Sequence, residues 1–170
     1  MDLRQKLEEK AAFFNEELEK YLKHGHPNVL YDAARHLPLA GGKRLRPCIA
    51  MLSCEAVGGE VTKAMPLAAA LELVHSFTLV HDDIMDTAQL RRNIPTVHLK
   101  FGEPTAIIAG DLLFAKAFEA MHALQNDCAI FKELDYGLIS CVREICEGQQ
   151  LDMEFEKRQD VTEKEYVEMI

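Results

Sequence analysis

Three aspartates and two arginines stand close together in the segment LVHDDIMDTAQLRR, residues 79–92. On an α-helix, Asp82 and Asp86 lie one turn apart on one stripe, whereas Asp83 points roughly 100° away from Asp82. Acidic side chains are disfavoured at the C-terminal end of a helix, and neighbouring acids repel one another. A divalent cation would relieve both costs, and oxygen ligands without a nearby Cys or His pair suit Mg²⁺. These aspartates are therefore candidate Mg²⁺ ligands.

Basic residues on both sides of this segment indicate that phosphate would be held beside the metal. Arg91 and Arg92 carry forked N–H donors that match phosphate oxygens. Upstream, the turn GGKRLRP places Lys43 and Arg46 three residues apart at the start of a helix, where free backbone N–H groups also favour anions. Metal-holding acids beside phosphate-holding arginines describe a diphosphate site. The acids could instead form an ordinary solvated helix end, and the turn alone could be structural.

Helices account for nearly all of the residues that would position this site. Amphipathic spacing, with Pro and Gly near the ends, predicts helices over residues 2–23, 27–36, 43–57, 66–86, 104–124 and 127–157. Thr162 and Glu165 spell a capping box, so a further helix begins there and is still running at residue 170. The residues between 86 and 104 are interpreted as a loop. Because no strand-like alternation of useful length occurs, the predicted fold class is all-α.

Length, charge and cysteine content limit the class of protein. The 170 residues fit a single domain over 1–170, and the net charge of −9 argues against general binding to nucleic acid or anionic membranes. The N-terminus has no apolar signal region, and no later run approaches the roughly 20 apolar residues of a membrane span. Five cysteines without a CxxC pair lie in apolar stretches, which predicts buried reduced thiols and a cytoplasmic protein: Cys48, Cys54, Cys128, Cys141 and Cys146.

Five motifs occur in one order between residues 41 and 152: GGKRLRP, ELVHSFTLVHDDIMD, RRNIPTVH, AGDLL and GQQLD. In this order and spacing the chain resembles the trans-isoprenyl diphosphate synthases, which are all-α prenyltransferases. The resemblance implies the helical bundle of the isoprenoid synthases. It also implies a reaction in which Mg²⁺ helps an allylic diphosphate to ionise and the double bond of isopentenyl diphosphate attacks the allylic carbocation.

The resemblance assigns roles to individual residues. It makes Asp82 and Asp86 metal ligands with Asp83 in support, and it puts Arg91 on the allylic diphosphate. It gives isopentenyl diphosphate four contacts and one site of close backbone approach: Lys43, Arg46, His75 and Arg92, with Gly42 for the approach. Gln149 and Asp152, which share a face of a long helix, would act in the layer around the metal ligands and their water.

Product length in the family depends on bulky residues upstream of the first aspartate-rich motif. Phe77, five positions before Asp82, resembles the archaeal arrangement associated with geranylgeranyl diphosphate. Thr78 lies nearer to the aspartate face of the helix on a 100° wheel. The same wheel puts Phe77 about 140° from Asp82, so it is the resemblance that implies geranylgeranyl diphosphate as the product, with Phe77 and Thr78 near the substrate chain.

Family members are close to twice this length, and their second half brings a second aspartate-rich motif that this sequence lacks. The expected fold is therefore an apparently truncated bundle. The chain could be an N-terminal fragment, half of a split enzyme whose partner chain brings the other motif, or a self-associating protein that sets two copies of the first motif face to face. Because unpartnered helices expose apolar stripes, we expect a homodimer or higher oligomer. The competing class is a non-catalytic subunit or a prenyl diphosphate binder.

Overall fold

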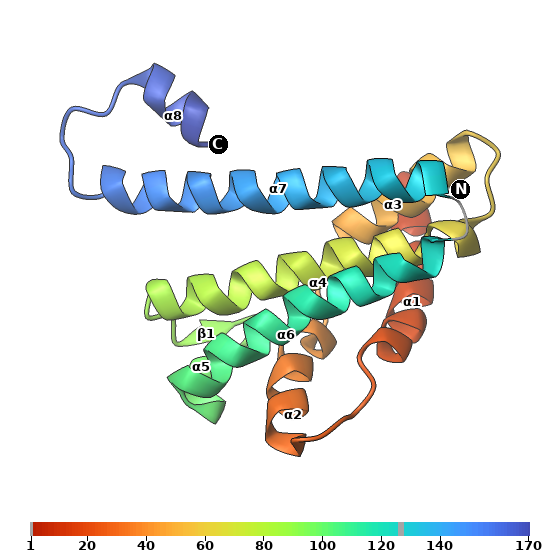
Figure 1. The fold of residues 1–170 in the computed structure, drawn as a ribbon, viewed down its shortest axis with the longest axis horizontal. Helices are drawn as coiled ribbons and strands as arrows, with labels where there is room; N and C mark the ends of the chain where they lie inside the picture. Colours follow the sequence, from red (N-terminus) through yellow and green to blue (C-terminus); the bar gives the residue numbers. More distant parts are fainter. Residues whose placement is uncertain (1, 126–127) are drawn as a thin grey trace. The chain divides into compact units, whose positions relative to one another are not determined.

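The computed structural model describes residues 2–125 and 128–170, without the side chain of Cys128, and it is almost entirely helical (Figure 1). The chain divides into two compact units, residues 1–128 and 129–170, which are described separately. The all-α class is confirmed. The expectation of a single domain over residues 1–170 stays a prediction.

The first unit holds most of the helices and a short hairpin. Its elements are α1 (Leu3–Tyr21), α2 (Asn28–His36), the 3-10 helix η1 (Pro38–Ala40), α3 (Leu45–Ala56), α4 (Val61–Met85), β1 (Leu90–Arg91), β2 (Ile94–Pro95), α5 (Val97–Phe101), α6 (Glu103–Met121) and the 3-10 helix η2 (His122–Leu124).

Helix α4 is the central element of this unit and packs against both α3 and α6. Figure 1 shows α4 and α6 side by side. Small residues permit this close approach, because Ala69 on α4 and Ala109 on α6 are fully buried. A Cβ added to Gly110 would lie 2.2 Å from Nε2 of His81, and that nitrogen is 3.0 Å from the carbonyl oxygen of Ile107. The glycine of AGDLL therefore makes room for the residue that precedes the aspartates.

Helix α4 begins at Val61, five residues before the predicted start at Pro66. Proline ordinarily ends or begins a helix, since it lacks an N–H and its ring crowds the preceding turn. Here Pro66 lies just past the first turn and is buried, so burial offsets the loss of one hydrogen bond. Pro47 of the helix predicted over 43–57 lies in the first turn of α3, which begins at Leu45, so its missing N–H removes no helical hydrogen bond.

The predicted loop after α4 contains a small antiparallel hairpin. β1 and β2 pair Leu90 with Pro95 and Arg91 with Ile94. The two residues between the strands, Arg92 and Asn93, have φ values of 54° and 63°, the left-handed conformations of a type I′ turn. Strands of two residues show no periodicity in the sequence, which is why the hairpin was not predicted.

The second unit consists of α7 (Cys128–Phe155) and α8 (Glu163–Met169). The predicted capping box is confirmed, since Thr162 Oγ1 accepts from the Glu165 N–H and Glu165 Oε2 accepts from the Thr162 N–H at 2.8 Å. The Thr162 N–H and the Arg158 guanidinium together hold the pKa of Glu165 at about 2. The start of the helix predicted over 127–157 falls partly outside the described residues.

The prediction that all five cysteines are buried is wrong. Cys48 in α3 is buried and Cys54 is half-buried, but Cys141 and Cys146 of α7 are exposed. The second unit has only two helices, too few to surround either one. The side chain of Cys128 lies outside the described residues.

Helix α4 alone among the described helices is long and apolar enough to cross a membrane by length and composition. Half of its most apolar stretch is buried inside the protein. The core helix of a soluble protein has the same composition, and α4 is the core helix of its unit.

Candidate functional site

The three aspartates at the end of α4 have different surroundings. Asp82 is 31% exposed at its side chain, Asp86 is exposed, and Asp83 is 1% exposed. Arg91 of β1 closes over Asp82 and Asp83, with Nε donating to Asp83 Oδ1 at 2.8 Å and Nη2 donating to Asp82 Oδ2 at 3.3 Å. The hydrogen bond to Asp83 is the main cause that raises the pKa of Arg91. The hairpin is therefore fastened to α4 at the aspartates themselves.

Two of these carboxylates fit a Mg²⁺ ion. Asp82 and Asp86 are one helical turn apart, with the Asp86 N–H donating to the Asp82 carbonyl at 2.8 Å, and both side chains reach solvent. Within residues 2–125 and 128–170, no group of three His, Cys, Asp or Glu side chains could hold a metal on its own. Mg²⁺ is commonly held by one or two carboxylates together with substrate phosphates and water. The donor set fits a metal that arrives with a diphosphate.

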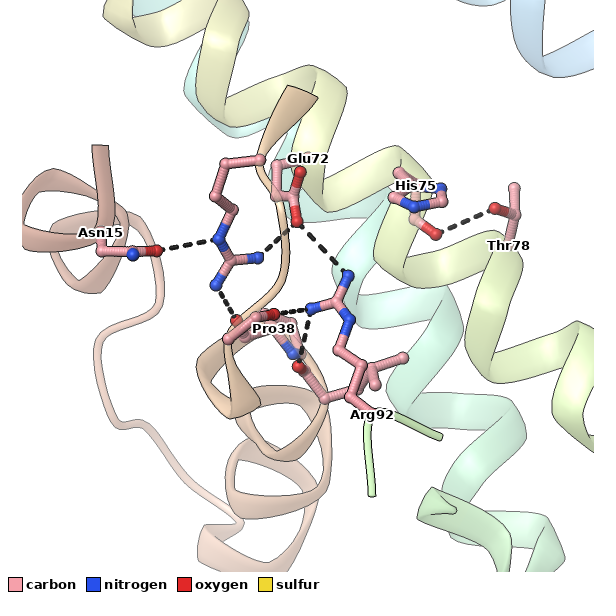
Figure 2. A network of polar contacts seen from close by, with 9 residues as sticks. Asn15, Pro38, Glu72, His75, Thr78 and Arg92 are labelled. Atoms are coloured by element: carbon pink, nitrogen blue, oxygen red, sulfur yellow. Dashed lines mark hydrogen bonds and ion pairs between the residues drawn. The ribbon is translucent and has the colours of Figure 1, made fainter. Parts of the chain in front are cut away.

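A buried network of arginines lies further up α4 (Figure 2). Glu72, 2% exposed, accepts from Nη1 of Arg44, and its Oε1 lies 3.7 Å from Nη2 of Arg92. Arg44 also donates from Nε to Asn15 Oδ1 of α1 at 2.8 Å and from Nη2 to the Pro38 carbonyl. A single carboxylate thus joins α1, η1, the start of α3 and the hairpin turn to the central helix.

Arg92 also holds the glycine turn that precedes Lys43. Its Nη1 donates to the carbonyls of Gly41 and Leu37, the latter at 3.3 Å. A Cβ on Gly42 would lie 2.9 Å from Arg92 Cζ, and Gly42 has a φ of 139°. The family resemblance implies that Gly42 permits close approach of the backbone to substrate, which stays a prediction; in the structure Gly42 makes room for a guanidinium. Burial lowers the pKa of Arg92, and Glu72 opposes that effect.

His75 lies one turn beyond Glu72 and is half-buried among cations. Its pKa is lowered first by burial and then by Arg46, with smaller contributions from Arg92 and Arg91, whereas Glu72 acts to raise it. The positive charges of Arg46, Arg91 and Arg92 thus all act against protonation of this imidazole. Arg46 is itself exposed on α3, as is Lys43 in the preceding turn.

Phe77 and Thr78 lie along α4 between His75 and the aspartates, on different faces of the helix. Phe77 packs edge-on against His81 with ring centroids 5.0 Å apart, and its ring lies 5.2 Å from that of Phe114 on α6. Phe114 in turn contacts Phe118 at 5.0 Å. Thr78 donates its hydroxyl to the His75 carbonyl at 2.9 Å. Phe77 is thus the first ring of an aromatic row that continues along α6.

Gln149 and Asp152 belong to the second unit. Both lie on α7 and line a cavity of about 760 Å³ between α7 and α8. Glu144, Glu147 and Glu168 line the same cavity, so its wall is acidic. The role of Gln149 and Asp152 near metal-bound water stays a prediction.

Sequence reasoning missed Glu72 and Arg44. Glu72 stands alone in the apolar run LAAALELVHS, and a lone acid in a helix that is otherwise apolar signals a buried charge that must be paired. Arg44 lies between the exposed residues Lys43 and Leu45, and nothing in its residue type indicates that it alone is buried. Its burial follows from a left-handed φ of 51° just before α3, which turns it towards α1 and α4.

Comparison with known proteins first identifies the class of fold and then the family. The fold matches solved isoprenoid synthases, among them the crystal structure of a geranylgeranyl pyrophosphate synthetase from Pyrococcus horikoshii, with a TM-score of 0.89 and 46% identity over 99% of this chain and 51% of that chain. The polyprenyl synthetase family model matches residues 27–170. The chain belongs to the polyprenyl synthetase family.

Curated relatives agree with this family. A geranylgeranyl diphosphate synthase from Methanosarcina mazei is 46% identical over all of this chain and 52% of its own length. A polyprenyl synthase from Caulobacter crescentus, solved with calcium and isoprenyl diphosphate, has a TM-score of 0.85 and 30% identity over 98% of this chain and 50% of that chain. The chain spans about half the length of the curated relatives it matches.

Proposed function

We propose that this protein takes part in trans-prenyl transfer, condensing isopentenyl diphosphate with an allylic diphosphate, and that geranylgeranyl diphosphate is the product. The observation that carries the proposal is the arrangement along α4: the accessible carboxylates Asp82 and Asp86 lie at its end, where Arg91 donates to Asp82. Further up the helix, His75 feels the positive charges of Arg46 on α3 and of Arg92 in the hairpin turn. The names of the relatives support this substrate class and product.

The residues divide the work between the two diphosphates. Asp82 and Asp86 would hold Mg²⁺, which would neutralise charge developing on the leaving diphosphate. Arg91 donates to that same diphosphate, and the group around His75 holds isopentenyl diphosphate. The C–O bond of the allylic diphosphate breaks, a C–C bond forms to isopentenyl diphosphate, and one proton is lost. Apolar residues around Phe77 exclude water, which would otherwise quench the carbocation.

The decisive experiment supplies both substrates to the purified chain. It is incubated with Mg²⁺, isopentenyl diphosphate and dimethylallyl, geranyl or farnesyl diphosphate, and the products are separated by chain length. A C20 product that vanishes in Asp82→Ala and Asp86→Ala supports the proposal. If diphosphate binds in a Mg²⁺-dependent manner but no product forms, the chain is a binder or half-enzyme instead.

We further propose that the chain works as a homodimer or higher oligomer in the cytoplasm, or with a partner chain that brings a second aspartate-rich motif. The unpartnered apolar side chains of α3, such as Ile49 at 60% exposure, support association. Sedimentation of the chain at micromolar concentration tests self-association, and a monomer would contradict it.

A further inference from the structure

Glu72 is the buried carboxylate around which the arginines of the first unit are arranged. Its side chain is 3% exposed, and it accepts from Arg44, which is 2% exposed, while Arg92 approaches the same oxygen at 3.7 Å. Because Glu72 does not reach solvent, it cannot touch a substrate directly. Any part it plays in binding must pass through the side chains that it holds.

The charges in this network do not balance. One carboxylate faces two guanidinium groups, those of Arg44 and Arg92, whose side chains are 2% and 18% exposed. A buried ion pair is favourable only where its geometry and hydrogen bonds are good, and an excess of buried positive charge is costly. The network therefore keeps positive charge at a fixed place, and a bound anion would lower that cost.

Backbone conformation supports the same conclusion. Arg44 has a φ of 51° and Arg92 a φ of 54°, left-handed values that cost free energy for residues other than glycine. Both of these strained residues face Glu72. Strained backbone conformations persist where tertiary contacts hold them. Here the contact that Arg44 and Arg92 share is the carboxylate of Glu72.

We propose that Glu72 is a positioning residue of the diphosphate pocket, holding Arg92 against the Gly41–Gly42 turn so that the cations beside His75 are presented to a diphosphate. This inference rests on the proposed function, since it needs the pocket to bind diphosphate. Arg44 is the tight partner of Glu72 and fixes its carboxylate to α1 through Asn15. Arg92, at the longer distance, is the side chain that Glu72 positions.

If Glu72 positions Arg92, Glu72→Gln should weaken pyrophosphate binding. If Glu72 contributes only its charge, the same substitution should have the opposite effect. Removing a negative charge beside an anion pocket should tighten the binding of inorganic pyrophosphate, whereas releasing Arg92 should weaken it. We expect the Kd of pyrophosphate, measured by calorimetry with the whole chain in the presence of Mg²⁺, to rise on the order of tenfold. Glu8→Gln is the matched control, because Glu8 pairs with Arg4 on the exposed surface of α1. An unchanged or lower Kd in Glu72→Gln overturns the inference.

A double-mutant cycle separates positioning from a general fold defect. If Glu72 acts through Arg92, then Glu72→Gln should change the Kd less than twofold when Arg92 is already Met. A loss of similar size in both backgrounds means that Glu72 is merely structural, and the inference fails. Should Glu72→Gln not fold, Glu72→Asp keeps the charge but withdraws the carboxylate, and the same cycle is run with it.

Product formation is measured in parallel, so that a failure of the proposed prenyl transfer can be told apart from a failure of the proposed role of Glu72. A chain that binds pyrophosphate but forms no product contradicts the proposed prenyl transfer, and the ratio of Kd values then decides the role of Glu72. A wild-type chain that does not bind pyrophosphate overturns the inference. If the chain is active, we expect Glu72→Gln to raise the KM for isopentenyl diphosphate more than it lowers kcat.

Discussion

The guanidinium of Arg91 grips the buried carboxylate of Asp83 with two nitrogens, Nε at 2.8 Å and Nη2 at 2.7 Å from the same oxygen. Asp83 is therefore the anchor of the hairpin, while Asp82 and Asp86 on either side of it remain accessible. The three aspartates do not act alike, although they stand together in the sequence. The middle position serves the arginine that we propose binds the allylic diphosphate.

Arg91→Met should lower the free energy of unfolding by about 3 kcal/mol, because it leaves the Asp83 charge buried without its partner. Urea denaturation followed by circular dichroism measures the change. Arg4→Met is the control: Arg4 and Glu8 are 85% and 65% exposed, so its loss should cost less than about 0.5 kcal/mol. Equal effects of the two substitutions would contradict the anchoring role of Asp83.

His75 should stay neutral at pH 7 and should titrate below 6.5 in the ligand-free protein. Burial and the charges of Arg46, Arg92 and Arg91 lower its pKa, against the opposing effect of Glu72. The stability gained by keeping His75 neutral is fully present above the unfolded-state pKa of about 6.5, and it is lost as the pH falls through that value towards the folded-state pKa.

An NMR titration of the His75 ring tests this directly, and denaturation of His75→Gln between pH 5 and 7.5 shows whether the pH dependence disappears. Bound pyrophosphate should raise the pKa of His75, since an anion favours the imidazolium. A ligand-free pKa at or above 6.5 would refute the cationic surroundings described for His75.

Gly42→Ala should abolish pyrophosphate binding, whereas Gly41→Ala should not. Both glycines have positive φ, 139° and 96°, so either substitution strains the backbone by about 1–3 kcal/mol. Only at Gly42 would the new Cβ collide with Arg92, at 2.9 Å from Cζ. Measuring both the stability and the pyrophosphate affinity of the two variants separates the effect of backbone strain from the effect of displacing Arg92. Equal affinities would mean that Arg92 moves aside at no cost to the site.

Mg²⁺ should tighten pyrophosphate binding through Asp82 and Asp86. In the double variant Asp82→Ala/Asp86→Ala we expect Mg²⁺ to have no effect on affinity, with little change in unfolding midpoint, because neither carboxylate is buried. Calorimetry with and without Mg²⁺ measures this. Asp32→Ala, an exposed acid of α2 beside His24, should keep the full Mg²⁺ dependence. Persistence of the dependence in the double variant would exclude these ligands.

Phe77→Ala should shift the products towards longer chains. The ring of Phe77 begins the aromatic row through Phe114, so removing it opens space along the face of α6. Product chain length by chromatography measures the effect, with Phe13→Ala on the surface of α1 as the control. If the distribution is unchanged, the end of the cavity lies elsewhere.

Much of this molecule could be predicted because helices leave a periodic pattern. The helical class, the capping box at Thr162 and the placement of Asp83 away from Asp82 all follow from the geometry of 3.6 residues per turn. The start of α4 was misplaced because Pro66 is tolerated inside a buried helix, where packing outweighs the local cost of proline.

The hairpin and the Glu72 network could not be predicted for a different reason. Two-residue strands have no period, and the left-handed conformations of Arg44 and Arg92 are set by tertiary contacts and not by their residue types. Lone polar residues in apolar helices, such as Glu72, are the best sequence signal for this kind of network. The residues that pair with such a polar residue cannot be identified from the sequence, because they lie on distant segments that only the fold brings together.

Two consecutive residues of the hairpin reach carboxylates that are far apart on α4. Arg91 binds Asp83 and Arg92 approaches Glu72, eleven positions away along the helix, which is about 16 Å at 1.5 Å per residue. The type I′ turn sends the two side chains in opposite directions along the helix axis. Because the turn has only two residues, it fixes the spacing between the points on α4 that the two arginines reach. If each arginine holds one diphosphate, the hairpin sets the spacing between the two diphosphates, and lengthening the turn by one residue would displace Arg92 and its diphosphate relative to Arg91.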